Sequence, residues 1–220
     1  ALAWRLVNRH VEHTGDFAGL RLLPALAAYR ALVRAKVALL SPDGGAEFQR
    51  CWPLAQRLLR DPRPQLVLVC GLSGSGKSTL ALMLAETLGA VRLRSDVERK
   101  RLFGLPPTAR PDAALGLYTP EATQRTYARL GELAHTLLTG GLSVVVDAAA
   151  LRQHERTTLR DLALVCGATF EVVACEAPAE RLLARIQARQ AANQDASDAD
   201  LAVLALQQRV VEPLPADWAT

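Results

Sequence analysis

The sequence is poor in lysine, in aromatic residues and in long apolar runs, and each scarcity argues against a class of protein. Only Lys36, Lys77 and Lys100 among its 26 basic residues are lysine, and the net charge is a modest +4. Aromatic residues make up 5% of the chain, and no aromatic ladder for stacking bases accompanies the basic residues. No apolar run approaches the roughly 18 residues that cross a bilayer, and the N-terminus lacks the pattern of a secretory signal. We therefore expect no membrane protein, and the charge does not demand nucleic acid as a partner.

Cysteine is scarce as well. The four cysteines form no C-x-x-C pair, and three of them lie inside apolar runs; they are Cys51, Cys70, Cys166 and Cys175. Neither a disulfide framework nor a cysteine metal site is indicated. The sequence predicts a protein of a reducing compartment, the cytoplasm.

The 220 residues are sufficient for one large domain, or for one domain with an appendage. Half of them are hydrophobic and 22% are charged, a composition typical of globular proteins. A chain of this length buries roughly 70% of its unfolded surface and needs no staple to fold.

The first part of the chain is helical in pattern. Residues 1–40 show apolar positions at helical spacing, with a break at residues 14–16 and a second helix starting at Pro24. Residues 41–45 are a strong break, a short helix is predicted around Gln56, and the prolines of residues 61–64 require extended backbone. We place a boundary there, between a helical segment at 1–61 and a second unit at 62–220.

The second unit alternates strands with helices. Apolar runs of strand length are each followed by amphipathic sequence of helical length: strands at 66–70, 90–94, 143–146 and 169–175, and helices at 77–88, 121–138, 152–165 and 179–190. This alternation predicts an α/β fold, a three-layer parallel sheet with helices on both faces, preceded by the helical segment. Ligands of such sheets bind at the carboxyl ends of the strands.

A phosphate-binding motif follows the first strand. Residues 71–78, GLSGSGKS, fit the Walker A or P-loop pattern G-x-x-x-x-G-K-[ST] and open a predicted helix. Glycines let backbone N–H groups converge on phosphate oxygens, and the helix N-terminus adds partial positive charge. The pattern predicts nucleotide contacts from Gly71, Ser73, Gly74, Ser75, Gly76, Lys77, Ser78 and Thr79.

A magnesium site needs a carboxylate near this loop. Residues 144–146 are three valines that deliver Asp147 to the same sheet edge, while Ser78 offers a hydroxyl. We predict Ser78 and Asp147 as metal ligands, with a helix N-cap as the alternative role of Asp147.

Two further pairs of residues distinguish a kinase from other P-loop proteins. Asp96 and Arg99 follow the second strand, where a carboxylate can orient an acceptor hydroxyl and take its proton. The alternative is an N-cap Asp96 with a solvated Arg99. Arg185 and Arg189 share a helical face with Arg181 and can close over phosphates, or can form a solvated stripe. Neither an N-K-x-D guanine tetrad nor an L-S-G-G-Q signature occurs.

The region after these arginines predicts a lid. Ser197 with Asp200 resembles a helix-start box before an apolar run. The polar residues 190–197 would then form a hinged segment over the nucleotide.

These motifs together resemble a known family across residues 65–212: small AAA-type P-loop kinases related to the kinase half of polynucleotide kinase, to zeta-toxin kinases and to gluconate and adenylylsulfate kinases. The resemblance implies ATP and Mg²⁺ as cofactors. It implies Asp96 as the catalytic base that activates the acceptor, Arg99 as an acceptor contact, Arg189 as the lid arginine and Arg185 near the nucleotide. Relatives often carry Thr or Asn soon after the third-strand aspartate, where this chain has three alanines at 148–150, so Arg152 and Arg156 are considered as substitute acceptor contacts or as surface charges.

Residues 8–37 resemble the closing helices of an aminoglycoside-phosphotransferase-like domain, which precedes such a kinase in some bacterial two-domain proteins. The resemblance implies a covalently linked N-terminal domain outside this chain. It also implies that His13 and Asp16 belong to a scaffold.

The expected function is ATP- and Mg²⁺-dependent transfer of the γ-phosphate to a hydroxyl of a small molecule, a nucleotide or RNA. Six basic residues close in sequence would suit a phosphorylated or RNA acceptor, or are ordinary surface charge: Arg92, Arg94, Arg99, Lys100, Arg101 and Arg110. The alternatives are a nucleic-acid 5′-hydroxyl kinase and a non-catalytic or slowly hydrolysing ATP switch. Asp96 facing an open acceptor pocket would favour the kinase.

Overall fold

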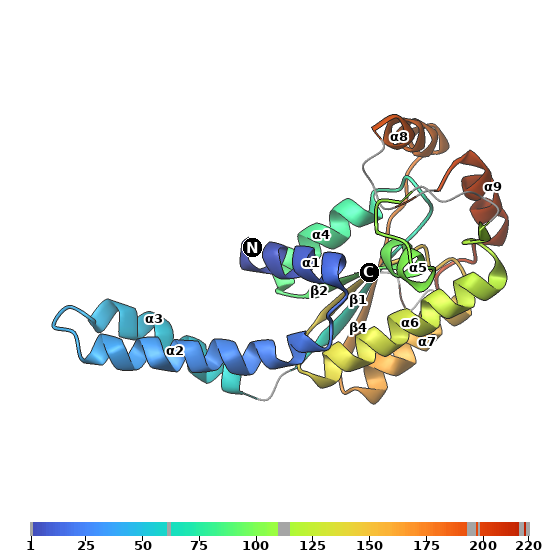
Figure 1. Ribbon diagram of the computed structural model, residues 1–220. Coiled ribbons are helices and arrows are strands. Elements are labelled where there is room, and N and C mark those ends of the chain that lie inside the picture. Colours follow the sequence, from blue (N-terminus) through green and yellow to red (C-terminus); the bar gives the residue numbers. More distant parts are fainter. Residues whose placement is uncertain are drawn as a thin grey trace.

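A parallel sheet forms the centre of the molecule. The computed structural model describes residues 2–60, 63–109, 115–192, 197, 199–215 and 218. The four strands of the sheet lie in the order β2-β3-β1-β4 and are β1 (Gln65–Cys70), β2 (Val91–Arg94), β3 (Val144–Asp147) and β4 (Thr169–Ala174) (Figure 1). All three strand pairs are parallel. The predicted α/β class is confirmed.

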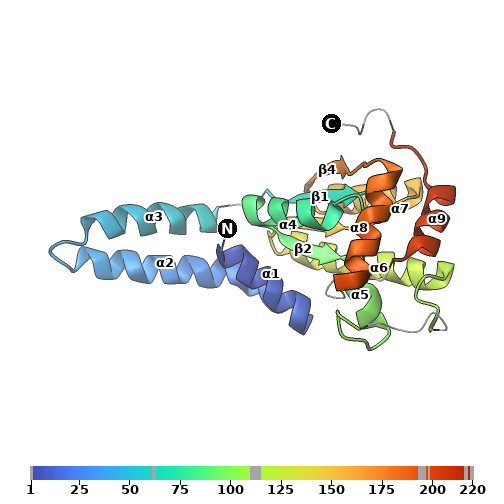
Figure 2. The ribbon, with the colours of Figure 1, turned by 90° about the horizontal axis from the view of Figure 1, so that it is seen from above.

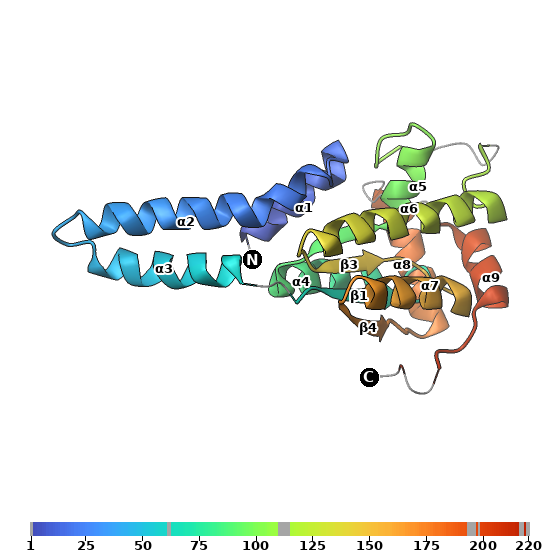
Figure 3. The ribbon, with the colours of Figure 1, turned by 90° about the horizontal axis from the view of Figure 1, so that it is seen from below.

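Helices cover both faces of this sheet. They are α4 (Lys77–Leu88), α5 (Ser95–Leu102), α6 (Pro120–Thr139), α7 (Gln153–Val165), α8 (Ala179–Ala192) and α9 (Leu201–Val210). Helix α4 packs on one face and α6 with α7 on the other (Figures 2 and 3). Helices α8 and α9 lie beyond the carboxyl ends of the strands, where the predicted lid was placed (Figure 2).

The core follows from strand β1, which is apolar on both faces. Val67 and Val69 pack with Ala81 and Ala85 of α4, whereas Leu66 and Leu68 point into a larger cluster on the opposite face. A parallel strand between two helical layers has no solvated side, so its run of apolar residues is continuous. Each fully buried leucine or valine contributes about 1.5–3 kcal/mol relative to an exposed one.

The N-terminal residues form two different structures. Helices α2 (Leu23–Leu39) and α3 (Gly45–Leu59) make an antiparallel hairpin that extends away from the sheet (Figure 1). Residues 40–44 are the turn of this hairpin, which overlaps the predicted break. The helix predicted to be short around Gln56 is 15 residues long and contains Pro53, because packing against α2 outweighs the local cost of the proline.

Helix α1 (Leu2–Thr14) and the 3₁₀ helix η1 (Gly19–Leu22) belong to the packing of the sheet. Val11, Phe17 and Leu20 are buried in the same cluster as residues of β1, β2 and β3. Asp16 accepts a hydrogen bond from the Gly19 N–H at 3.0 Å, a structural contact that fits the predicted scaffold role. A domain boundary at residue 61 stays a prediction, but the core extends to residues before it. Residues 61 and 62 lie outside the described residues.

Asn8 closes the free edge of β2. Its side-chain amide donates to the Ala90 carbonyl oxygen at 3.0 Å, and its oxygen accepts from the Arg92 N–H at 2.6 Å. Asn8 is buried, and it supplies to β2 the partners that a neighbouring strand would supply. Helix α1 thus replaces a fifth strand at this edge.

We expect Asn8→Ala to lower the free energy of unfolding by about 1–3 kcal/mol, because a buried N–H and a buried carbonyl lose their partners together. Urea denaturation followed by circular dichroism measures the change. Arg9→Ala, at the exposed next position of α1, is the matched control and should change stability by less than about 0.5 kcal/mol. Equal stabilities of the two variants would contradict the edge role of Asn8.

Candidate nucleotide and acceptor site

The loop between β1 and α4 has the backbone of a phosphate cradle. Gly71, Gly74 and Gly76 have φ values of +134°, +82° and +103°, which other residues rarely adopt. A Cβ on Gly71 would lie 2.3 Å from the Cys175 carbonyl oxygen, and one on Gly74 would lie 2.8 Å from that of Leu182. The glycines are therefore required both by the turn and by the close approach of β4 and α8.

A cavity of about 1580 Å³ opens above this loop. It is lined by every residue that the sequence assigned to the site except Gly71: Ser73, Gly74, Ser75, Gly76, Lys77, Ser78, Thr79, Asp96, Arg99, Asp147, Arg152, Arg185 and Arg189. The structure thus brings residues from α4, α5, β3, α8 and two loops to one place. Gly71 lies beneath the loop, against β4.

Asp147 lies at the end of β3 and is almost fully buried, with 4% of its surface exposed. Burial raises the pKa of its carboxyl group above the ordinary range, against the opposing effect of Arg94, Lys77, Arg92 and a hydrogen bond with Ser78. Its Oδ2 atom has no hydrogen-bond partner among the described residues, and the Arg94 Nε lies 3.7 Å away. A buried carboxylate oxygen that accepts no hydrogen bond is suited to bind a cation.

Magnesium fits this arrangement. No cluster of three histidine, cysteine or acidic side chains occurs in the described part of the chain, so an all-protein metal cage is not formed there. Mg²⁺ in nucleotide sites is bound through one or two protein oxygens together with phosphates and water. Asp147 and the Ser78 hydroxyl are the protein oxygens that would hold it.

Lys77 begins α4 and lies at the bottom of the cavity. Its ammonium group donates to the Leu72 carbonyl oxygen at 3.1 Å, across the loop. Its charge also acts on Asp147. The lysine is therefore held beside both the amide cradle and the buried carboxylate.

Asp96 and Arg99 lie on α5 and line the same cavity as the loop. Helix α5 begins at Ser95 with Arg94 at the N-cap position, so Asp96 is in the first turn and lines the cavity. Arg99 is 8% exposed; it donates to the Leu117 carbonyl oxygen at 3.0 Å and lies over the Tyr118 ring at 4.8 Å. The alternative of an N-cap Asp96 with a solvated Arg99 is wrong, because β2 runs directly into α5 and buries this arginine.

Arg185 ties α8 to the phosphate loop. Its guanidinium donates to the Gly74 and Ser75 carbonyl oxygens, both at 3.1 Å. Leu182 and Ile186 of the same helix pack with Leu204, against Leu72. Arg189 donates to the Ala199 carbonyl oxygen at 2.5 Å, so both arginines have internal contacts, and a purely solvated stripe is wrong for these two.

Helix α9 begins later than predicted. Asp200 is its N-cap, and the Asp200 carboxylate accepts from the Val203 N–H at 2.8 Å. The box that started at Ser197 is therefore wrong, because the capping carboxylate sits three positions further on. Of the predicted hinge, residues 193–196 lie outside the described residues.

Gln207 of α9 is a site residue that sequence reasoning missed. Its side-chain oxygen accepts from the Ser73 N–H at 2.8 Å, on the loop itself. An amide at this position of the loop is directed toward the phosphate region. The only sequence signal was its place on an amphipathic helix after the lid.

The three alanines after β3, residues 148–150, contact the phosphate loop and α6 through their backbone. The Gly71 N–H donates to the Ala149 carbonyl oxygen at 3.1 Å, and the Ala150 N–H donates to the Tyr127 hydroxyl at 2.7 Å. Burial raises the pKa of Tyr127, so its hydroxyl stays protonated. Arg156 is buried and donates to the Glu212 and Pro213 carbonyl oxygens, so Arg152 alone of the considered pair lines the cavity.

The fold and this cradle define a class: a P-loop protein with the three-layer architecture of P-loop kinases. Residues 66–214 match the model of the family AAA_33, an AAA domain, and the chain belongs to that family. No helix among the described residues has the length and apolar character to span a membrane.

Two kinds of relatives are similar to the chain. An uncharacterized protein of Mycobacterium tuberculosis (strain H37Rv) is 33% identical over 218 residues, which is 96% of this chain and 42% of the relative. The chain thus spans less than half of that curated relative. Among solved structures, a gluconokinase from Sinorhizobium meliloti has a TM-score of 0.51 at 23% identity, covering 73% of this chain and 82% of its own. A sugar kinase from Janibacter sp. has a TM-score of 0.50 at 21% identity, covering 71% and 82%. These likenesses show the fold.

We expect Asp147→Asn to keep the fold and to leave the melting temperature without ligand unchanged or higher, because the charge of a desolvated carboxylate is removed. The same variant should lose the additional stabilisation that Mg²⁺ gives to a nucleotide complex. Thermal unfolding with and without Mg²⁺ and a non-hydrolysable ATP analogue measures both effects. A variant that melts lower without ligand and still responds to Mg²⁺ would contradict this assignment.

Proposed function

We propose that the protein is an ATP- and Mg²⁺-dependent phosphotransferase that transfers the γ-phosphate to a hydroxyl of a small molecule. The observation that carries the proposal is the cavity shared by the phosphate loop and Asp96. A nucleotide held on the loop and an alcohol beside Asp96 would occupy the same space. Family membership and the kinase-like architecture support the proposal.

Each side chain then has a defined part. The loop amides and Lys77 bind the phosphates, and Ser78 with Asp147 would hold Mg²⁺, which neutralises phosphate charge when bound. Asp96 accepts the hydrogen bond of the acceptor hydroxyl and takes its proton as the phosphoryl group leaves the nucleotide. Arg189 and Arg185 lie on the lid side, where a guanidinium stabilises charge on the transferred group.

The acceptor half of the cavity favours a kinase over an ATP switch. The same cavity is also lined by polar side chains outside the phosphate loop: Arg99, Tyr118, Glu121, Gln124, Arg152 and His154. A switch that only signals nucleotide binding has no use for this space. We propose Arg99 and Arg152 as acceptor contacts.

The basic residues near Asp96 favour a small acceptor over RNA. Arg92 and Arg94 pair with Glu12, and Arg101 donates to the Glu12 carbonyl oxygen at 2.8 Å. Lys100 is buried and donates to the Pro107 and Ala109 carbonyl oxygens. These cations serve the fold, and they do not form a free basic groove for a nucleic-acid backbone. Arg110 lies outside the described residues.

The proposal places the activity in residues 62–220. The helical residues before them resemble part of a preceding phosphotransferase-like domain, and the curated relatives are more than twice as long as this chain. We propose that a linked N-terminal domain accompanies the kinase in the whole protein. The cytoplasm remains the predicted location.

Asp96→Asn and Lys77→Ala should separate transfer from binding. We expect Asp96→Asn to lower the rate of transfer by about 10²–10⁴-fold while the Kd for ATP changes by less than about two-fold, because the base does not bind the nucleotide. Lys77→Ala should weaken ATP binding by about ten-fold or more, since a charge-assisted contact with the phosphates is lost. Labelled ATP incubated with pooled sugars, nucleosides, aminoglycosides and RNA, scored for labelled product, first identifies the acceptor.

Asp161→Asn, on the exposed side of α7, is the matched control and should change neither property. An equal loss of ATP affinity in the Asp96 and Lys77 variants would refute the division of roles. Release of phosphate with no labelled acceptor in any pool would favour the switch.

A further inference from the structure

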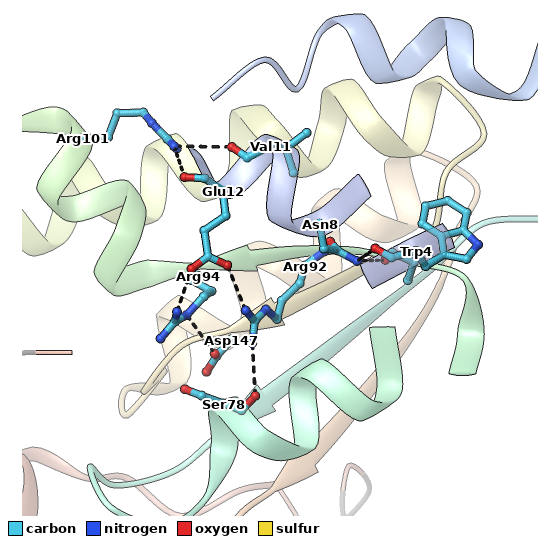
Figure 4. A network of polar contacts seen from close by, with 10 residues as sticks. Trp4, Asn8, Val11, Glu12, Ser78, Arg92, Arg94, Arg101 and Asp147 are labelled. Atoms are coloured by element: carbon cyan, nitrogen blue, oxygen red, sulfur yellow. Dashed lines mark hydrogen bonds and ion pairs between the residues drawn. The ribbon is translucent and has the colours of Figure 1, made fainter. Parts of the chain in front are cut away.

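The Glu12 carboxylate of α1 lies at the edge of the candidate nucleotide site. Glu12 accepts hydrogen bonds from both arginines of β2, through Oε2 from Arg92 at 2.9 Å and through Oε1 from Arg94 at 2.8 Å (Figure 4). Burial tends to raise the pKa of Glu12, but Arg94 and Arg92 together lower it below its ordinary value. Glu12 is thus a charged partner that both guanidinium groups share.

The two arginines belong to the same wall as Asp147. Alternate residues of a strand share a face, so Arg92 and Arg94 point to one side of β2. The register places Arg94 beside Asp147 of β3 and Arg92 beside Val145. Arg92 also donates to the Ser78 carbonyl oxygen at 3.2 Å, so these arginines border both predicted metal ligands (Figure 4).

Helix α1 reaches this wall because it wraps around the edge of β2. Val11 is buried in the cluster that holds Val91 and Leu93, on the opposite face of the sheet. Glu12, the next residue, lies on the Arg92 and Arg94 side. The Arg101 guanidinium donates to the Glu12 carbonyl oxygen and so fixes the backbone of α1 at this point.

In the absence of Glu12, Arg94 could form a closer ion pair with Asp147. The Arg94 Nε is 3.7 Å from the Asp147 Oδ2, just beyond hydrogen-bond distance, while its Nη1 is held by Glu12. A guanidinium released from Glu12 could form a bidentate pair with Asp147, the geometry that it prefers with carboxylates. Such a pair would occupy the oxygen that a cation requires.

The charges around Asp147 also indicate that loss of Glu12 would weaken the binding of a divalent cation. Arg94, Lys77 and Arg92 all act on the Asp147 carboxylate, and Glu12 offsets part of this positive charge through its contacts with Arg92 and Arg94. Without Glu12 the positive charge around Asp147 increases, and it repels a divalent cation in a partly buried site, where screening by water is weak.

We propose that Glu12 is a positioning residue for the metal site: by binding the Arg92 and Arg94 guanidinium groups it limits the contact of Arg94 with Asp147 to an ion pair of 3.7 Å, and so keeps the Asp147 Oδ2 available to the nucleotide-bound divalent cation. This inference rests on the proposed function only in that it takes Asp147 as the metal ligand. It links the N-terminal helix, which precedes the matched family region, to the chemistry of the phosphate loop. Because coupling is reciprocal, binding of the metal nucleotide also strengthens the docking of α1.

The test is metal-dependent binding of a fluorescent, non-hydrolysable ATP analogue to the whole chain, titrated with Mg²⁺ and in EDTA. We expect Glu12→Gln to raise the Mg²⁺ concentration at half-maximal binding by about ten-fold, as one uncompensated charge near a divalent ion implies. Affinity for the analogue in EDTA should stay the same or increase, since the additional positive charge attracts free phosphates. Glu12→Gln with Arg94→Gln restores the charge balance and should return the midpoint to within about two-fold of the wild type.

Glu86→Gln is the matched control, because Glu86 binds Arg5 of α1 at 2.6 Å and lies near the C-terminal end of α4, whereas Ser78 lies in the first turn of that helix. It should leave the Mg²⁺ midpoint unchanged. Glu12→Asp, which keeps the charge on a shorter arm, should give an intermediate midpoint and provides a second variant if Glu12→Gln folds poorly. A lower melting temperature of the Glu12 variants with an unchanged midpoint would overturn the proposal and leave Glu12 a purely structural residue.

A midpoint that the Arg94 substitution does not restore would also overturn it. A wild-type chain that binds the analogue equally well with and without Mg²⁺ would overturn both this proposal and the metal dependence of the proposed function. Metal-dependent binding with the expected midpoints, but no transfer to any acceptor, would support the role of Glu12 and refute the kinase.

Discussion

The site depends on a steric constraint at the turn between β1 and α4. Three glycines with positive φ let the backbone curl between the end of β4 and the side of α8, where no Cβ fits at Gly71 or Gly74. The curl places residues 73–79 along the cavity and starts α4 at Lys77. The positions of Ser78 and Lys77, and the contacts of Arg185 and Gln207 with the loop, all follow from this turn.

A second constraint is electrostatic and comes from the edge strand. Strand β2 carries two arginines on the face of the sheet that also carries Asp147, and a carboxylate from α1 compensates them. Burying unpaired charge is costly, so this edge requires a partner from another element. The kinase-like fold and its N-terminal helix are therefore joined by charge as well as by packing.

The sequence predicted the parts of this structure that depend on local pattern. The strands, the four predicted helices of the second unit and the phosphate loop lie close to their predicted positions, because apolar periodicity and the glycine spacing determine them. The assigned site residues also share one cavity, as expected for residues at the carboxyl ends of parallel strands. Their chemical roles stay proposals.

What could not be predicted depends on contacts distant in the chain. Glu12 meets residues about 80 positions later, and Gln207 meets a residue 134 positions earlier, so no local spacing reveals either contact. The start of α9 shifted because Ser197 and Asp200 are both good caps, and only tertiary packing selects between them. Two arginines alternating along a buried strand were the available signal for a hidden carboxylate.

The amide of Asn8 has a consequence for how the protein can be divided. A shortened chain that starts at the predicted boundary would uncover the backbone of β2 and leave the Ala90 carbonyl and the Arg92 N–H without the Asn8 side chain. Exposed strands of this kind pair with one another and promote aggregation. Fragments of the chain that contain the sheet should therefore retain residues 2–22, because their removal would expose the β2 edge to pairing between molecules.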